Sequence, residues 1–219
     1  MDSLFDVAEG GENREERLAE LARQVSVCTR CDLALNRTNT VFGMGDPYSP
    51  LMLVGEGPGE NEDATGLPFV GRAGKLLDDI LKAVDLTRDD VYLTNTVKCR
   101  AAQPEGGRMK NRPPRAGEIN ACNIYLEGQR EAIKPEIILC LGGPAAKTII
   151  DKDFRITKDR GKWYEVGGAM VMATFHPAYV LRQRDEDLVR AKRAVWKDVQ
   201  AVYAEYRQAL EARGSAPER

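Results

Sequence analysis

Short apolar runs alternate along this chain with longer segments in which apolar residues recur every three or four positions. Four runs have the length and aliphatic content of strands, and they cover 51–54, 91–95, 137–141 and 171–175. Helical spacing covers 14–27, 73–84 and 185–212, and another helix is predicted to follow Gly142-Gly143-Pro144 and to run through Ile150. This alternation of strands and helices predicts an α/β fold with a largely parallel sheet.

The ends of the predicted strands carry most of the chemically useful residues. In a parallel sheet the carboxyl ends of the strands share one edge, and binding sites form there. The residues at these ends are Glu56-Gly57-Pro58, Asn95, Gly142-Gly143 and His176. We therefore expect the functional site at this edge of the sheet.

The length of 219 residues favours one compact domain. We place it at 13–212, between an acidic flexible tail at 1–12 and a flexible C-terminus at 213–219. The sequence has no secretory leader and no apolar run of membrane length, so a cytoplasmic protein without a membrane partner is expected. In that compartment cysteines point to metal binding or catalysis before disulfides.

Four of the five cysteines have polar neighbours, whereas Cys140 lies in the apolar run 137–141 and is expected to pack as a small hydrophobe. The four are Cys28, Cys31, Cys99 and Cys122, of which Cys99 is predicted to end a strand and Cys122 to begin a helix. Four thiolates suffice for one tetrahedral zinc ion or one cubane iron–sulfur cluster. One close pair with two distant single cysteines favours the cluster, and four free thiols are the remaining alternative.

Charge changes the picture only locally. The net charge of −2 gives no global sign of nucleic-acid binding. The segment 98–115, however, holds six lysines and arginines against the single acid Glu105. Such a run is either a phosphate-binding surface or a solvated loop, and charge alone favours the loop.

Three residues offer chemistry suited to a nucleobase. His176, the only histidine, is expected at the sheet edge, where a neutral imidazole can donate a hydrogen bond to a developing oxyanion. The Asn95 amide presents a donor and an acceptor that complement the N3–H and O4 edge of uracil and mismatch cytosine. Phe69 follows a polar loop and is either a core residue or a stacking platform for a base.

Four ordered motifs, taken with the four cysteines, resemble the signature blocks of family 4 uracil-DNA glycosylases, the iron–sulfur members of their superfamily. The motifs are VGEGPGENED at 54–63, LPFVGRAG at 67–74, TNTVKCR at 94–100 and HPAYVLR at 176–182. The resemblance extends from about Cys28 to Trp196. It implies a three-layer α/β/α fold with a central four-stranded, mostly parallel sheet, and a [4Fe-4S] cluster on Cys28, Cys31, Cys99 and Cys122.

The same resemblance implies an activity and its residues. A monomer, nucleoid-associated if prokaryotic, would flip uracil out of single- or double-stranded DNA and hydrolyse its N-glycosidic bond. The implied substrate residues are Glu56, Gly57, Pro58, Glu62, Phe69, Asn95 and His176, with Glu56 and His176 catalytic and Glu62 at the wall that rejects the thymine methyl. The implied DNA contacts are Arg100, Arg108, Lys110, Arg112, Arg182 and Leu181, with Leu181 or Val180 leading a wedge into the vacated base stack.

The chain departs from its family between the third and fourth cysteines, where typical members are shorter. Residues 101–110 are inserted before Asn111-Arg112-Pro113 rejoins the pattern. A related branch of the superfamily has a longer loop here with a histidine that traps the deoxyribose, but this loop holds no histidine. Two alternatives to an excising enzyme therefore stay open: a uracil-DNA binder without turnover, and a zinc-stapled nucleic-acid-binding module.

Overall fold

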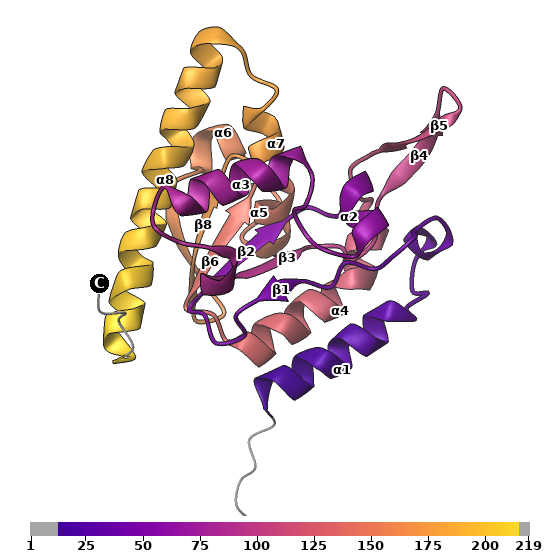
Figure 1. Cartoon of the computed structure of the whole chain (residues 1–219), viewed down its shortest axis with the longest axis horizontal. Helices are drawn as coiled ribbons and strands as arrows, with labels where there is room; N and C mark the ends of the chain where they lie inside the picture. The colour runs from indigo at the N-terminus through magenta and orange to yellow at the C-terminus, as the bar shows by residue number, and fades with distance from the viewer. Residues whose placement is uncertain (1–12, 215–219) are drawn as a thin grey trace, which may run out of the picture.

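The computed structural model of the chain describes residues 13–214, whose main sheet has six strands in the order β1-β3-β2-β6-β8-β7 (Figure 1). The strands are β1 (Met44–Gly45), β2 (Leu51–Gly55), β3 (Tyr92–Asn95), β6 (Ile137–Leu141), β7 (Trp163–Val166) and β8 (Ala169–Thr174). The four central strands are the predicted ones and are mutually parallel. The prediction of a four-stranded sheet is corrected by two antiparallel edge strands that are only partly buried, the two-residue β1 and the four-residue β7.

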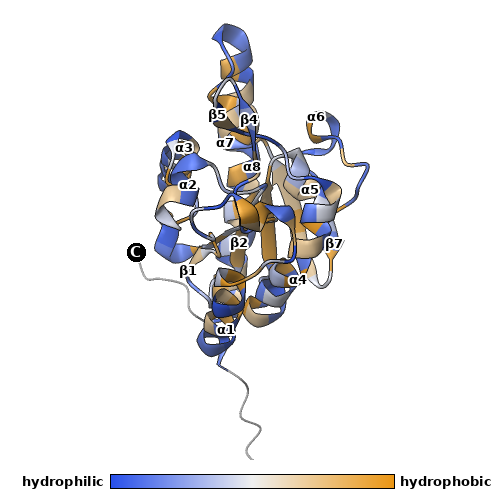
Figure 2. Cartoon of the chain, turned by 90° about the vertical axis from the view of Figure 1, so that its right-hand side faces the viewer, coloured by the Kyte–Doolittle hydropathy of each residue, from blue (hydrophilic) through white to orange (hydrophobic). Residues whose placement is uncertain are grey.

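Helices cover both faces of this sheet, which gives the expected three layers. The helical elements are α1 (Arg14–Ser26), η1 (Asp32–Leu35), α2 (Glu60–Thr65), α3 (Arg72–Lys82), η2 (Arg88–Asp90), α4 (Ala116–Ile133), α5 (Gly143–Ile149), α6 (Ile156–Asp159), α7 (Pro177–Val180) and α8 (Asp185–Ala212). Successive strand residues point to opposite faces. Leu51 and Leu53 therefore pack with α3 and α8, whereas Met52 and Val54 pack with α1, α4 and α5. Figure 2 shows the strands as the hydrophobic centre of this arrangement.

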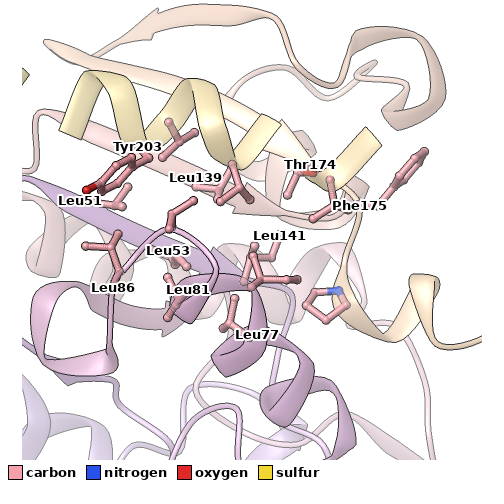
Figure 3. A pocket seen from close by; sticks show the side chains of 16 residues that line it. Leu51, Leu53, Leu77, Leu81, Leu86, Leu139, Leu141, Thr174, Phe175 and Tyr203 are labelled. Carbon is pink, nitrogen blue, oxygen red and sulfur yellow. The ribbon is translucent and has the colours of Figure 1, made fainter. Parts of the chain in front are cut away.

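The core on the α3 and α8 side contains a small cavity lined mainly by aliphatic side chains (Figure 3). Leu53 of β2, Leu77 of α3 and Leu141 of β6 converge there, and Tyr203 of α8 closes it from above. The long stripe predicted for 185–212 accounts for this packing, since Val195, Val199 and Val202 belong to the same core cluster, where they bury α8 against the sheet. The cavity is a gap in the core, and Phe175 at one end of it also lines the cleft at the carboxyl edge of the sheet.

The segment expected as a basic loop is a hairpin. Strands β4 (Ala102–Glu105) and β5 (Arg108–Asn111) pair antiparallel and project away from the body of the molecule (Figure 1). Gly106 and Gly107 form the two-residue turn with φ of +59° and +76°, which L-residues with a side chain rarely adopt. The hairpin has no apolar face, which is why hydrophobic periodicity did not predict its strands.

Two cysteine placements differ from expectation. β3 ends at Asn95, so Cys99 lies in the segment after the strand. Cys122 lies inside α4, which begins at Ala116, and therefore does not begin a helix. Arg213 and Gly214 form a turn after α8, whereas the predicted tail at 1–12 and the residues 215–219 lie outside the described part. Between 13 and 214, no helix has both the length and the apolar character needed to span a bilayer.

Candidate active site and cysteine centre

The carboxyl edge of the sheet opens into a cleft of about 1010 Å³, as the strand ends predict. All seven residues expected to bind substrate line it, namely Glu56, Gly57, Pro58, Glu62, Phe69, Asn95 and His176. These residues come from the loops after β2 and β8, from the last position of β3, from α2 and from the segment before α3, so the fold gathers parts of the chain that are distant in sequence. Of the expected DNA contacts, Arg112 and Arg182 line the same cleft.

Asn95 and Phe69 meet over Gly55. Gly55 pairs with Asn95 in the parallel register of β2 and β3. A Cβ atom at Gly55 would lie 2.4 Å from Asn95 Oδ1 and 2.7 Å from Phe69 Cζ. Only glycine leaves room there for both side chains, so the Asn95 amide and the Phe69 ring occupy neighbouring walls of one cleft.

The backbone of Phe69 is held in an unusual conformation. Its φ is +54°, in the left-handed region that a bulky residue rarely adopts. The Arg88 guanidinium donates hydrogen bonds to the carbonyls of Pro68 and Phe69 and so holds this turn. Gly74 permits the close approach of α3, because a Cβ there would lie 1.6 Å from the Phe69 carbonyl oxygen. Strain of this kind is found where a side chain must be aimed for function.

The carboxylate of Glu62 accepts hydrogen bonds from three backbone N–H groups. They are the N–H groups of Gly59 at 3.0 Å, Val70 at 2.9 Å and Gly71 at 2.8 Å. The residue therefore ties the start of α2 to the segment that follows Phe69. Both carboxylate oxygens of Glu62 therefore already accept hydrogen bonds from the backbone.

His176 has a defined tautomer. Its Nδ1 accepts a 3.0 Å hydrogen bond from the backbone N–H of Ala178, so the ring proton lies on Nε2. Burial lowers the pKa of His176 to about 4, and the nearby Arg182 cation acts in the same direction. The side chain is thus a neutral imidazole at pH 7 that offers one N–H donor, as the sequence suggested.

Glu56 lies in the same cleft as a partly desolvated acid. Burial raises the pKa of its carboxyl group, and the Arg182 cation partly offsets that rise. The sequence left open whether Glu56 caps the following turn or serves the reaction. The N–H of Gly59 in that turn donates to Glu62. This arrangement favours a role for Glu56 in the cleft.

Of the two residues predicted to lead the wedge, Val180 and Leu181, only Leu181 is accessible. Val180 is 2% exposed and belongs to the core cluster with α3 and α8, so the prediction that it enters a base stack is wrong. Leu181 is the C-cap of α7 and remains partly exposed. Tyr179, on the same short helix, lines the cleft and stacks on Phe175 with ring centroids 4.7 Å apart.

The four polar-flanked cysteines come together at a second site. Cys28, Cys31, Cys99 and Cys122 line one small cavity, while Cys140 is fully buried apart from them in β6. The Arg37 guanidinium donates to Cys99 Sγ at 3.4 Å and to the Cys28 carbonyl at 2.7 Å. Tyr125 and Leu33 add an apolar lining.

Four thiols around one cavity are a donor set for either a single zinc ion or an iron–sulfur cluster. A zinc ion would draw four sulfurs to about 2.3 Å from one point. Among residues 13–214, no group of three or more His, Cys, Asp or Glu side chains is arranged to hold a single metal ion. A cubane iron–sulfur cluster also takes four cysteine thiolates, with N–H donors to sulfur of the kind that Arg37 supplies here.

The cations around the cleft are distributed differently from the sequence expectation. Arg100 donates to Asn111 Oδ1 at 2.7 Å and to the Met109 carbonyl, so it braces the hairpin. Arg112 forms a bidentate pair with the buried Glu118, at 2.8 and 2.6 Å. Arg108 is exposed on the hairpin, and Lys110, also exposed, pairs with Glu105. The structure thus assigns Arg100 and Arg112 to internal contacts.

Three cations of the cleft were missed from the sequence. They are Arg72 at the start of α3, Lys147 in α5 and Arg155 before α6. Lys147 and Arg155 lie in the segment 147–162, where Asp151, Asp153 and Asp159 are interspersed among the lysines and arginines, so no uninterrupted run of positive charge marks them. Only the fold brings them to one cleft with Arg182, where they make its rim basic.

Comparisons with known proteins agree with this geometry. A sequence model of the uracil DNA glycosylase superfamily matches residues 42–200. A type-4 uracil-DNA glycosylase of Thermotoga maritima is 44% identical over 189 residues, which are 85% of this chain and 93% of the relative. The type-4 enzyme of Archaeoglobus fulgidus is 42% identical over 76% of this chain and 84% of the relative, and that of Sulfurisphaera tokodaii is 44% identical over 76% of each.

Proposed function

Since this chain belongs to the uracil-DNA glycosylase superfamily, within its type-4 group, we propose that it excises uracil from DNA and leaves an abasic site. The observation that supports this most is the convergence of Asn95, Phe69 and a neutral His176 in one cleft. These three supply base reading, stacking and an N–H donor. The same cleft has basic side chains at its rim for the DNA backbone.

Base selection rests on Asn95. The base enters the cleft after being flipped from the stack, at a cost of a few kcal/mol. It then stacks on Phe69 while the Asn95 amide pairs with the uracil N3–H and O4. Cytosine reverses the donor and acceptor at this edge, so its entry would leave buried polar groups unpaired. Asn95 is 2% exposed, which makes that penalty large.

Bond cleavage separates a cationic sugar from a uracil anion. The Nε2–H of His176 is the donor that would stabilise the charge on uracil O2, and one such donor is typically worth about 3–4 kcal/mol. Because the Ala178 N–H occupies Nδ1, the ring presents Nε2–H without a competing tautomer. Glu56 is the carboxyl group suited to hold the attacking water or to face the sugar cation, and Arg182 favours its ionised form.

DNA would lie across the mouth of the cleft. Arg72, Lys147, Arg155 and Arg182 line it, and the exposed Arg108 and Lys110 extend the basic surface along the hairpin. Such contacts position the duplex or single strand without reading sequence. Leu181, which is partly exposed, would fill the vacated stack. We take the acting form to be a monomer.

We assign a [4Fe-4S] cluster to Cys28, Cys31, Cys99 and Cys122, because these thiols share one cavity. The bound cluster would join the N-terminal segment to α4 and to the segment after β3, and it would supply no redox chemistry to hydrolysis. The residues of the reaction all lie in the separate cleft. Bracing the base of the hairpin is therefore the role that this position supports.

The test is to identify the product formed from an oligonucleotide with one uracil. The proposal predicts an abasic site, seen as strand scission after alkali, and an intact strand when thymine replaces uracil. A protein–DNA adduct that survives boiling in denaturant, without scission, would instead identify a binder without turnover. No histidine lies in 101–115 to form such an adduct, and the only histidine is in the cleft.

A further inference from the structure

A lysine buried between the two sites has no role in the reaction proposed for the cleft. Lys98 is 1% exposed, and its ammonium group donates three hydrogen bonds inside the protein. The acceptors are the Asn95 carbonyl at 2.7 Å, Thr94 Oγ1 at 2.7 Å and Gln129 Oε1 at 2.6 Å. All three acceptors are neutral groups. A buried lysine is rarely retained without a specific interaction to make, because burial of its charge is costly.

Lys98 contacts both functional regions. Its backbone N–H donates to Cys122 Sγ at 3.3 Å, and the residue lines the cysteine cavity. Its side chain runs the other way and ends on the carbonyl of Asn95, the residue that closes β3. The two interactions are chemically separate, since a substitution of the side chain leaves the backbone N–H in place.

The carbonyl of Asn95 matters because a hydrogen bond to it restrains the ψ angle of Asn95 and the position of the Cα atom from which the side chain extends. Beyond Asn95 the chain leaves the strand, and the next residue is held by the hydrogen bond from Thr96 N–H to the Gly55 carbonyl. Gln129, in turn, is fixed by its own bonds to the Phe42 carbonyl and Tyr92 Oη, so the ammonium group is held in place.

We propose that Lys98 is a positioning residue: it fixes the Asn95 carbonyl from the side of the cysteine centre and so holds the Asn95 amide in the orientation that reads uracil. The inference rests on the proposed function and deepens it. It also gives the cysteine centre a physical connection to base selection, through one residue that is anchored on Cys122 Sγ and ends on Asn95.

The test uses binding rather than turnover. DNA containing 2′-fluoro-2′-deoxyuridine resists cleavage, because fluorine disfavours the cationic sugar, and it still presents the uracil edge. The measured quantity is the ratio of the dissociation constants for normal DNA and for this DNA, obtained by fluorescence anisotropy on iron-loaded protein. Lys98→Met should lower this ratio at least tenfold, with unchanged affinity for normal DNA and unchanged iron content.

Tyr92→Phe is the matched control. It removes a hydroxyl from the same buried polar group, where Tyr92 Oη accepts from Gln129, without touching Asn95. Its ratio should equal that of the wild type. An equal fall in both variants would overturn the proposal, because it would reflect general loosening of the core. A fall in iron content in Lys98→Met would also overturn it, since the side chain would then serve the cysteine centre.

A second variant covers the case in which Lys98→Met does not fold. The double substitution Lys98→Met with Gln129→Met removes the donor together with an acceptor that it would leave unsatisfied. The same tenfold fall is expected, and an unchanged ratio in a folded variant overturns the proposal. If the wild-type protein itself shows no preference for the fluorinated uracil, the proposed function fails and not this inference alone.

Discussion

The backbone N–H of Ala178 donates a 3.0 Å hydrogen bond to Nδ1 of His176, and this one contact fixes which nitrogen carries the proton. Because Nδ1 accepts this hydrogen bond, it carries no proton, and the imidazole proton is on Nε2. The donor that His176 offers in the cleft is therefore Nε2–H. The histidine is also the N-cap of α7, and the same bond therefore starts that short helix. One hydrogen bond thus sets both the start of α7 and the position of the proton on the His176 ring.

The first prediction concerns removal of this donor. His176→Ala should reduce the single-turnover rate of uracil excision by roughly 10²–10³, because the Nε2–H acts mainly on charge that develops in the transition state. The dissociation constant for uracil-containing DNA should change little. A parallel loss of affinity and rate would assign His176 to substrate positioning.

The second prediction concerns acid. The pKa of His176 is about 4 in the folded protein, against 6.5 for an unperturbed histidine. Between these values the unfolded chain binds the extra proton, so protonation favours unfolding there. The contribution of His176 to stability is complete above pH 6.5 and is lost as the pH falls toward 4. The free energy of unfolding is measured by chemical denaturation from pH 7 to 4 for the wild type and for His176→Gln. It should fall more steeply with decreasing pH in the wild type.

Arg182 provides the internal control for this pH effect. Its cation lowers the pKa of both His176 and Glu56. Arg182→Gln should therefore raise both pKa values, and NMR titration of the single histidine can follow one of them directly. A histidine that titrates near 6.5 in the wild type would contradict the buried, neutral imidazole.

Individual residues show which parts of the fold and the site could be predicted from the sequence. The four central strands and the gathering of Glu56, Asn95 and His176 followed from apolar runs and from the rule for parallel sheets. The interactions of Arg88 with Phe69 and of Arg112 with Glu118 did not follow. They depend on where a side chain lands after folding, so a charge in the sequence does not show whether it faces a phosphate or a carboxylate.

The third prediction concerns the hairpin. Arg108→Gln with Lys110→Gln should weaken binding about equally for uracil-containing and normal DNA, and should lower the salt slope by roughly one unit for each phosphate interaction removed. The single-turnover rate at saturating enzyme should stay the same. The control is Lys192→Gln with Arg193→Gln, two exposed cations of α8 outside the cleft. If the control variant weakened DNA binding more than the hairpin variant, the DNA would bind at another face of the protein.

The fourth prediction concerns the cysteine centre. Anaerobically purified protein should be brown and contain about four irons. Cys99→Ser should lower the iron content, because Cys99 lines the shared cavity. Cys140→Ser should leave the iron content unchanged, since this thiol is packed within β6. Colourless wild-type protein with one equivalent of zinc would contradict the cluster assignment.

Excision of uracil by the pocket of Asn95, Phe69 and His176 is best tested by following the free base. Its release from a uracil-containing oligonucleotide is measured under single-turnover conditions with the wild type and with Asn95→Ala. We predict release by the wild type and a rate lower by orders of magnitude in Asn95→Ala, with the variant folded and its iron content unchanged. Near-normal release by Asn95→Ala would place the pocket elsewhere, and no release by the wild type would contradict excision itself.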